Sequence, residues 1–191
     1  MQSIHNKFKH AIGTGHKQIG LWSHLCSNIS IEILADCGYD WLLIDMEHSP
    51  NDLSEVLAQL QAMKGGTATP IVRPPWNDMV TFKRLLDIGV QNLLVPYIQT
   101  AEEARNAVSY TRYPPLGVRG YAGAPRASNY GRVKDYAHLN ATELCLLIYM
   151  IVLLFLSWTT TKCAIVIILI SCSTSTFPTR PRSLTINFFC C

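Results

Sequence analysis

The sequence predicts an α/β fold: an incomplete (β/α)8 TIM barrel that holds the first four to five β/α units, followed by an aberrant apolar C-terminal tail. Over the first 143 residues, short apolar runs alternate with helical patterns about every 20 to 30 residues, which is typical of a parallel α/β fold. No GxGxxG or GxxxxGK(S/T) loop follows these runs, which favours a barrel over a nucleotide-binding doubly wound sheet. A complete barrel takes about 250 residues, which is more than the 191 residues of this chain.

The first two units follow from their apolar patterns. Residues 18–22 predict a strand, and residues 27–37 predict a helix that ends at Gly38. Residues 40–45 are a continuous apolar run, which suits a parallel strand buried on both faces. We expect Asn51 to cap the next helix. Its apolar stripe is Leu53, Val56, Leu57 and Leu60.

The third unit begins with a strand over residues 70–73, which two prolines close. Asn77 or Asp78 is expected to start its helix, and Gly89 to end it. The residues expected on the inner face of this helix are Met79, Phe82 and Leu86.

The fourth unit has its strand over residues 92–96. Thr100 and Glu103 have the spacing of a capping box, which predicts a helix that starts there and ends near Tyr110.

Polar and aromatic residues gather where the predicted strands end, which in such a barrel is where the chemistry takes place. These residues are Trp22, Asp45, Glu47, His48, Arg73 and Gln99. His48 is a candidate general base, and Asp45 could fix its tautomer and raise its basicity. Arg73 ends a buried strand, where a guanidinium is costly unless it meets an anion.

Each of these residues also has a structural interpretation. A lone histidine such as His48 is most often a solvated surface residue, and Arg73 could pair with a surface acid. Trp22 is more often part of a core than a substrate contact. We expect Glu47 to point away from the barrel mouth or to cap a neighbour.

Several sequence motifs, collinear from about residue 6 to residue 148, resemble the HpcH/HpaI aldolase family. The matching segments are residues 19–22, 38–51, 70–74, 85–89, 94–96 and 111–120. The resemblance is greatest to members that cleave 4-hydroxy-2-oxo acids. It implies a class II retro-aldol reaction, in which a divalent metal (Mg, Mn or Co) chelates a small 2-oxo acid and cleavage yields pyruvate and an aldehyde.

The resemblance also implies roles for individual residues. His48, Asp45 and Arg73 match catalytic positions, with His48 as the base, Asp45 as its support and Arg73 beside the enolate oxygen. Arg73 and Trp22 are the expected substrate contacts. Family members assemble as homo-oligomers, but the elements that this would need lie beyond residue 148.

The sequence departs from the family at the end of the fifth strand, which residues 144–148 match. The family has a Gln-x-Glu segment there, whose Glu binds the metal, and Ile151 occupies the Glu position in this chain. The later Gly-Pro-Ala-Asp segment, with a second ligand, is also absent, and no Asp or Glu follows residue 148. Hard divalent cations need oxygen ligands, so we expect no protein metal ligands.

The composition changes at the same point, which predicts a boundary between residues 1–148, the barrel part, and residues 149–191, a non-homologous tail. Residues 144–191 contain no glycine and no acid, and they hold five of the seven cysteines. A frameshift explains these features together. The alternative is a membrane segment over residues 144–170, although Lys162 would make insertion expensive.

The remaining inferences concern partners and location. The polar N-terminus has no signal-peptide pattern, so we expect a cytoplasmic protein, with the membrane through residues 144–170 as the alternative. No basic stripe with interleaved aromatics indicates nucleic acid. Two other functions stay open: a non-enzymatic truncated or membrane-associated product, and a CoA-thioester lyase of the citrate lyase beta type.

Overall fold

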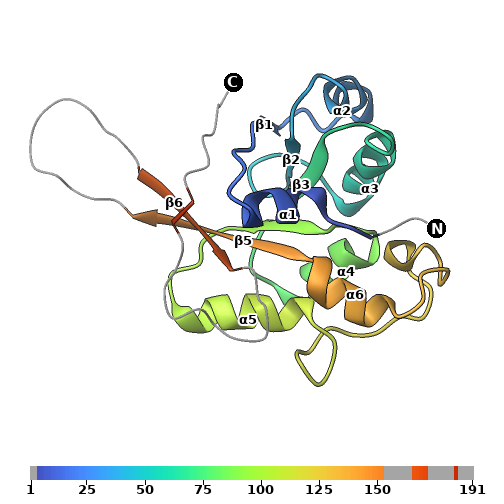
Figure 1. The fold of residues 1–191 in the computed structure, drawn as a ribbon, viewed down its shortest axis with the longest axis vertical. Helices are drawn as coiled ribbons and strands as arrows, with labels where there is room; N and C mark the ends of the chain where they lie inside the picture. The colour runs from blue at the N-terminus through green and yellow to red at the C-terminus, as the bar shows by residue number, and fades with distance from the viewer. Residues whose placement is uncertain (1–3, 153–164, 172–182, 185–191) are drawn as a thin grey trace, which may run out of the picture.

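The computed structural model describes residues 4–152, 165–171 and 183–184 (Figure 1). Its strands are β1 Gly20–Ser23, β2 Trp41–Asp45, β3 Thr69–Arg73, β4 Asn92–Val95, β5 Cys145–Val152, β6 Ile165–Ser171 and β7 Ser183–Leu184. Its α-helices are α1 Lys7–Gly13, α2 Asn28–Ala35, α3 Leu53–Ala62, α4 Met79–Asp87, α5 Ala101–Thr111 and α6 Tyr136–Glu143. A short 3-10 helix, η1 Arg126–Ser128, precedes α6.

The described strands form a single sheet in sequence order, β1 to β7. Strands β1 to β5 are parallel neighbours, and helices connect them, which confirms the predicted first units of a β/α barrel. Strand β6 then pairs antiparallel with β5, and β7 pairs antiparallel with β6. Within the described residues the sheet is therefore open, with β1 at one end and β7 at the other.

The two faces of the parallel sheet carry two separate apolar clusters. Leu42, Val72 and Leu93 face the cluster that helices α2 to α5 cover. Trp41, Ile71 and Leu94 belong to the second cluster on the opposite face, which would be the barrel interior. Alternate strand residues point to opposite faces, so the continuous apolar runs in the sequence supply both clusters at once.

Helix α1 covers the interior face, and the sequence patterns did not predict it. Its buried residues Phe8 and Ile12 join the interior cluster with Trp41 and Leu43. Figure 1 shows α1 lying across the sheet, with α2 and α3 beside the first strands and α4, α5 and α6 beside β4 and β5. The interior face is therefore closed near the N-terminal ends of the strands by the chain's own first helix.

Two expected helix details are wrong and one is confirmed. The N-cap of α3 is Asp52, in a capping box with Glu55, whereas the side chain of Asn51 holds the preceding loop. Met79 is exposed because it is the first residue of α4, and Leu85 is buried in its place. The capping box of Thr100 and Glu103 is present at the start of α5.

The apolar segment over residues 144–170 is not one helix where the structure describes it. Residues 145–152 and 165–171 are strands, and residues 153–164 lie outside the described residues. In the part of the chain that is described, no helix has the length and apolar character needed to cross a membrane. Strand β5 runs across the boundary between residues 148 and 149, and the division into two parts stays a prediction.

Gly20 is expected to be intolerant of any side chain, because a Cβ there would collide with the ring and the carbonyl oxygen of buried Trp41. We expect Gly20→Ala to lower the free energy of unfolding by about 1–3 kcal/mol. Gly13→Ala is the matched control, since a Cβ at that helical position meets nothing within 4 Å. Urea denaturation followed by tryptophan fluorescence measures both, and equal effects of the two substitutions would refute the collision.

Candidate active site

Asp45 and Arg73 face each other at the carboxyl ends of two neighbouring strands. The register of β2 and β3 pairs Asp45 with Arg73, one pair beyond Ile44 and Val72. Since Leu43 and Ile71 point into the interior cluster, the residues two positions later point the same way. Asp45 is fully buried and Arg73 is 8% exposed, so the two charges meet inside the mouth of the barrel.

The guanidinium of Arg73 is held from three directions. It donates to both carboxylate oxygens of Asp45, with distances of 2.8 Å from Nε to Oδ1 and 2.5 Å from Nη2 to Oδ2. Its Nη1 lies 2.8 Å from Oε2 of Glu47. The centre of the guanidinium lies 4.5 Å from the centroid of the Trp22 ring. This bidentate and stacked geometry suits arginine and would not suit lysine.

Asp45 is the centre of a wider hydrogen-bond network. Its Oδ2 accepts a hydrogen bond from Nε1 of Trp22 at 3.2 Å and lies 3.0 Å from Nε2 of His24. Its Oδ1 accepts from the backbone N–H of Glu47 at 2.9 Å. The carbonyl oxygen of Asp45 accepts a hydrogen bond from the side chain of Asn51 at 2.6 Å, which fixes the loop that carries Glu47.

The network keeps the Asp45 carboxylate ionised. Burial alone would raise the pKa of Asp45, but hydrogen bonds from Arg73, the Glu47 backbone and Trp22 outweigh it and lower the pKa from 3.8 to about 2. Asp45 therefore carries a full negative charge at neutral pH.

The imidazole of His48 is placed differently from the sequence expectation. Asp45 accepts the backbone N–H of His48 at 3.4 Å, whereas Nε2 of the ring lies 3.6 Å from Oε1 of Glu47. The ring is 67% exposed and faces solvent at the mouth. In this structure Glu47, and not Asp45, is the carboxylate beside the His48 ring, so the expected orienting role of Asp45 is not seen.

Sequence reasoning missed two members of the cluster. Glu47, expected to point away, pairs with Arg73, and His24 was not considered. Both lie two residues beyond an interior-facing position, so strand alternation was the signal that could have found them. Gln99 is exposed, and its backbone N–H donates to Glu103.

Two exposed aromatic side chains also follow strand ends at this mouth. Trp76 comes after β3 and Tyr97 after β4, and their ring centroids lie 5.3 Å apart. Tyr97 has a φ of 56°, a left-handed conformation that a non-glycine residue seldom adopts. They add an apolar surface to a mouth that is otherwise lined by charged groups.

The described side chains at the mouth form no cation site by themselves. In the described part of the chain, no three His, Cys, Asp or Glu side chains at the mouth lie close enough to share an ion. The oxygens of Asp45 are already bound to Arg73, whose positive charge opposes a second cation beside them. The expected absence of protein metal ligands stays a prediction, because the side chains after Ile148 lie outside the description.

Residues 18–154 match the family model described as HpcH/HpaI aldolase/citrate lyase. A 4-hydroxy-2-oxo-heptane-1,7-dioate aldolase of Klebsiella pneumoniae is 54% identical over 146 residues, which are 76% of this chain and 55% of the relative. An enzyme of the same name from Salmonella typhimurium is 52% identical over 144 residues, again covering 55% of its length. The chain thus spans about half the length of the curated relatives it matches.

Solved structures show the same likeness in three dimensions. An HpcH/HpaI aldolase/citrate lyase family protein of Burkholderia cenocepacia matches with a TM-score of 0.72 and 39% identity, over 75% of this chain and 58% of that chain. An HpcH/HpaI aldolase of Desulfitobacterium hafniense matches with a TM-score of 0.62 and 28% identity, over 72% of this chain and 54% of that chain. The residues that match the family model include the strand ends that carry the Asp45–Arg73 cluster.

Proposed function

The chain belongs to the HpcH/HpaI aldolase/citrate lyase family, and from that premise we propose that its mouth is the oxo-acid half of a class II pyruvate aldolase site. The proposed reaction is retro-aldol cleavage of a 4-hydroxy-2-oxo acid to pyruvate and an aldehyde. The observation that carries the proposal is the buried guanidinium of Arg73, held by Asp45 and Glu47 at the strand ends. The names of the relatives, which are aldolases and thus carbon–carbon lyases, support it.

Arg73 is proposed to hold the oxygen that becomes negative during cleavage. The contacts with Asp45 and Glu47 use one N–H on each guanidinium nitrogen, so the remaining N–H groups can donate to a ligand oxygen. The two carboxylates and the Trp22 ring fix the guanidinium of Arg73. The guanidinium therefore needs no reorientation when negative charge develops on the substrate oxygen. Trp22 forms the wall beneath this position and is the proposed apolar contact of the bound oxo acid.

His48 is proposed as the base for the 4-hydroxyl group. Its ring takes the hydroxyl proton, the C3–C4 bond breaks, the aldehyde leaves, and the electron pair remains on the enolate of pyruvate. The returning proton then goes to C3 and completes pyruvate. Glu47 is the proposed positioning residue for His48, because its Oε1 lies 3.6 Å from Nε2 of the ring while its Oε2 contacts Arg73.

We also propose that this 191-residue chain does not catalyse the cleavage. The resemblance puts Ile151 where the family has its metal-binding Glu, and the mouth residues do not replace that ligand. Cleavage without a cation beside the carbonyl oxygen leaves Arg73 alone to stabilise the enolate. We therefore expect ligand binding at the mouth and no measurable cleavage.

Two measurements on the chain test these statements. Pyruvate release from a 4-hydroxy-2-oxo acid, with Mg or Mn added, should stay at the background rate, and metal-dependent turnover would refute the ligand argument. Oxalate, which mimics the pyruvate enolate, should bind, and Arg73→Lys should weaken its binding by about tenfold or more. Arg84→Lys changes an exposed arginine on α4 and is the control. Equal oxalate affinity in both variants would overturn the assignment of Arg73.

A further inference from the structure

Two histidines, His5 and His10, meet at the start of helix α1, and neither belongs to the cluster at the mouth. Asn6 is the N-cap of α1, and its side chain accepts a hydrogen bond from the backbone N–H of Lys9. The residue before an N-cap and the fourth residue of the helix lie side by side. These residues are His5 and His10, and their rings stack with centroids 4.3 Å apart and an interplanar angle of 24°.

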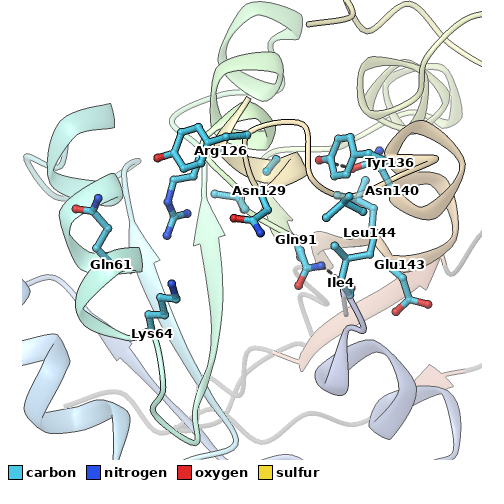
Figure 2. A pocket seen from close by; sticks show the side chains of 15 residues that line it. Ile4, Gln61, Lys64, Gln91, Arg126, Asn129, Tyr136, Asn140, Glu143 and Leu144 are labelled. Carbon is cyan, nitrogen blue, oxygen red and sulfur yellow. Dashed lines mark hydrogen bonds between the residues drawn. The ribbon is translucent and has the colours of Figure 1, made fainter. Parts of the chain in front are cut away.

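The carboxylate of Glu143, the last residue of α6, completes the group. Its Oε2 lies 3.2 Å from Nε2 of His10 and 3.9 Å from Nδ1 of His5. One potential ligand atom from each of the three side chains lies within 4.8 Å of the others. Figure 2 shows Glu143 at the rim of a pocket, with its carboxylate turned away from Lys64 and Arg126.

Buried Asn6 holds the start of α1 against the end of α6. Its backbone N–H donates to Oε2 of Glu143 at 2.7 Å, and its side chain donates to the carbonyl oxygen of Glu143 at 2.9 Å. The same side-chain nitrogen lies 2.8 Å from Oδ1 of Asn92, the first residue of β4. Since Asn6 is only 1% exposed, the fold itself keeps His5 and His10 next to Glu143. The group lies at the N-terminal ends of the strands, at the opposite edge of the sheet from Asp45.

We propose that His5, His10 and Glu143 form a binding site for a divalent transition-metal cation of the Zn²⁺ class, which ties α1 to α6. Imidazole and carboxylate ligands suit this class of ion. Ligand atoms around a tetrahedral zinc lie about 3.4 Å apart, given metal–ligand bonds of about 2.1 Å. The 3.2 Å between His10 and Glu143 is close to this value, and the 3.9 Å between His5 and Glu143 is slightly longer.

The electrostatics of this corner favour a cation. Glu143 puts a carboxylate at the C-terminal end of α6, where the helix dipole is negative. The ammonium group of Lys9 donates to the carbonyl oxygens of Thr142 and Leu144 there and offsets part of this negative potential. A metal ion binds both imidazoles in their neutral form.

The test is a zinc titration of the full 191-residue chain, prepared without a histidine tag and with only its accessible cysteines alkylated under native conditions. Calorimetry should show that His5→Gln/His10→Gln loses one equivalent of Zn²⁺, or binds it at least about tenfold more weakly. His16→Gln/His138→Gln removes two exposed histidines elsewhere and should bind as the parent chain does. Because the difference between these two variants is the readout, ions held at the mouth do not affect the conclusion.

A second readout reports the tie between α1 and α6. Zn²⁺ should raise the thermal unfolding midpoint of the parent chain and of the control variant, but not of His5→Gln/His10→Gln or Glu143→Gln. Absence of zinc binding by the parent chain, or equal binding and equal stabilisation in His5→Gln/His10→Gln, would overturn the proposal. Neither readout depends on aldolase activity, so the failure of the proposed function would leave this result interpretable.

Discussion

Joining residues 1–148 of this chain to the C-terminal half of the Klebsiella pneumoniae aldolase is expected to produce an enzyme that releases pyruvate from a 4-hydroxy-2-oxo acid with Mg or Mn. The chain is 54% identical to that relative over the shared part, so the sheet and the mouth should be compatible. The joined half would restore the Gln-x-Glu and Gly-Pro-Ala-Asp segments that the family resemblance implies. A metal beside the carbonyl oxygen contributes several kcal/mol to transition-state stabilisation, so the rate should exceed that of the unaltered chain by about 10³-fold or more.

Variants of the joined chain identify which residues of this protein contribute. His48→Gln and Arg73→Lys should each lower kcat/KM by about 10² or more, since both groups act on the reacting atoms. His16→Gln and Arg84→Lys change exposed residues of the same types and should leave kcat/KM unchanged. A joined chain that folds and binds metal without cleaving substrate would show that residues 1–148 no longer carry a working mouth.

Asp45→Ala is expected to lower the free energy of unfolding by about 3–5 kcal/mol, because it leaves the buried guanidinium of Arg73 without its bidentate partner. Arg73→Met should cost a similar amount, since it removes the cation that pairs with the buried carboxylate. The double variant Asp45→Leu/Arg73→Met replaces both charges with apolar groups and should lie close to the parent chain in stability. Urea denaturation of the four proteins measures the coupling, and additive effects of the two single changes would refute it.

The same pair should give the protein a distinct acid response. The pKa of Asp45 is lowered from 3.8 to about 2 in the folded chain, so its stabilising contribution is complete above the unfolded value. That contribution is lost as the pH falls from about 4 through about 2, and it amounts to about 2 kcal/mol. Asp45→Ala should lose this part of the acid dependence, while Glu32→Gln, a change on the exposed face of α2, should retain it. An unchanged acid response in Asp45→Ala would contradict this account.

Local patterns in the sequence were enough to predict the order of the elements in the parallel part of the sheet. The run over residues 40–45 predicted β2, because both neighbouring layers require apolar residues there. The Thr100–Glu103 spacing predicted the start of α5, because a capping box involves only residues within one turn. Asn51 failed as a cap because two adjacent polar residues were both suitable, and Asp52 has the partner Glu55 three residues later.

The family also followed from the sequence, through its collinear motifs. The candidate residues Asp45, His48 and Arg73 followed because the strand ends of a barrel are recognisable without coordinates. Only the tertiary structure decided which of these side chains are partners. Arg73 contacts both oxygens of Asp45 through the register of β2 and β3, and Glu47 lies beside His48. The tertiary structure likewise brought His5 and His10 to Glu143 across 133 or more residues of chain. Contacts of this kind depend on how separate elements pack against each other. No local pattern of residues shows which distant side chains will meet.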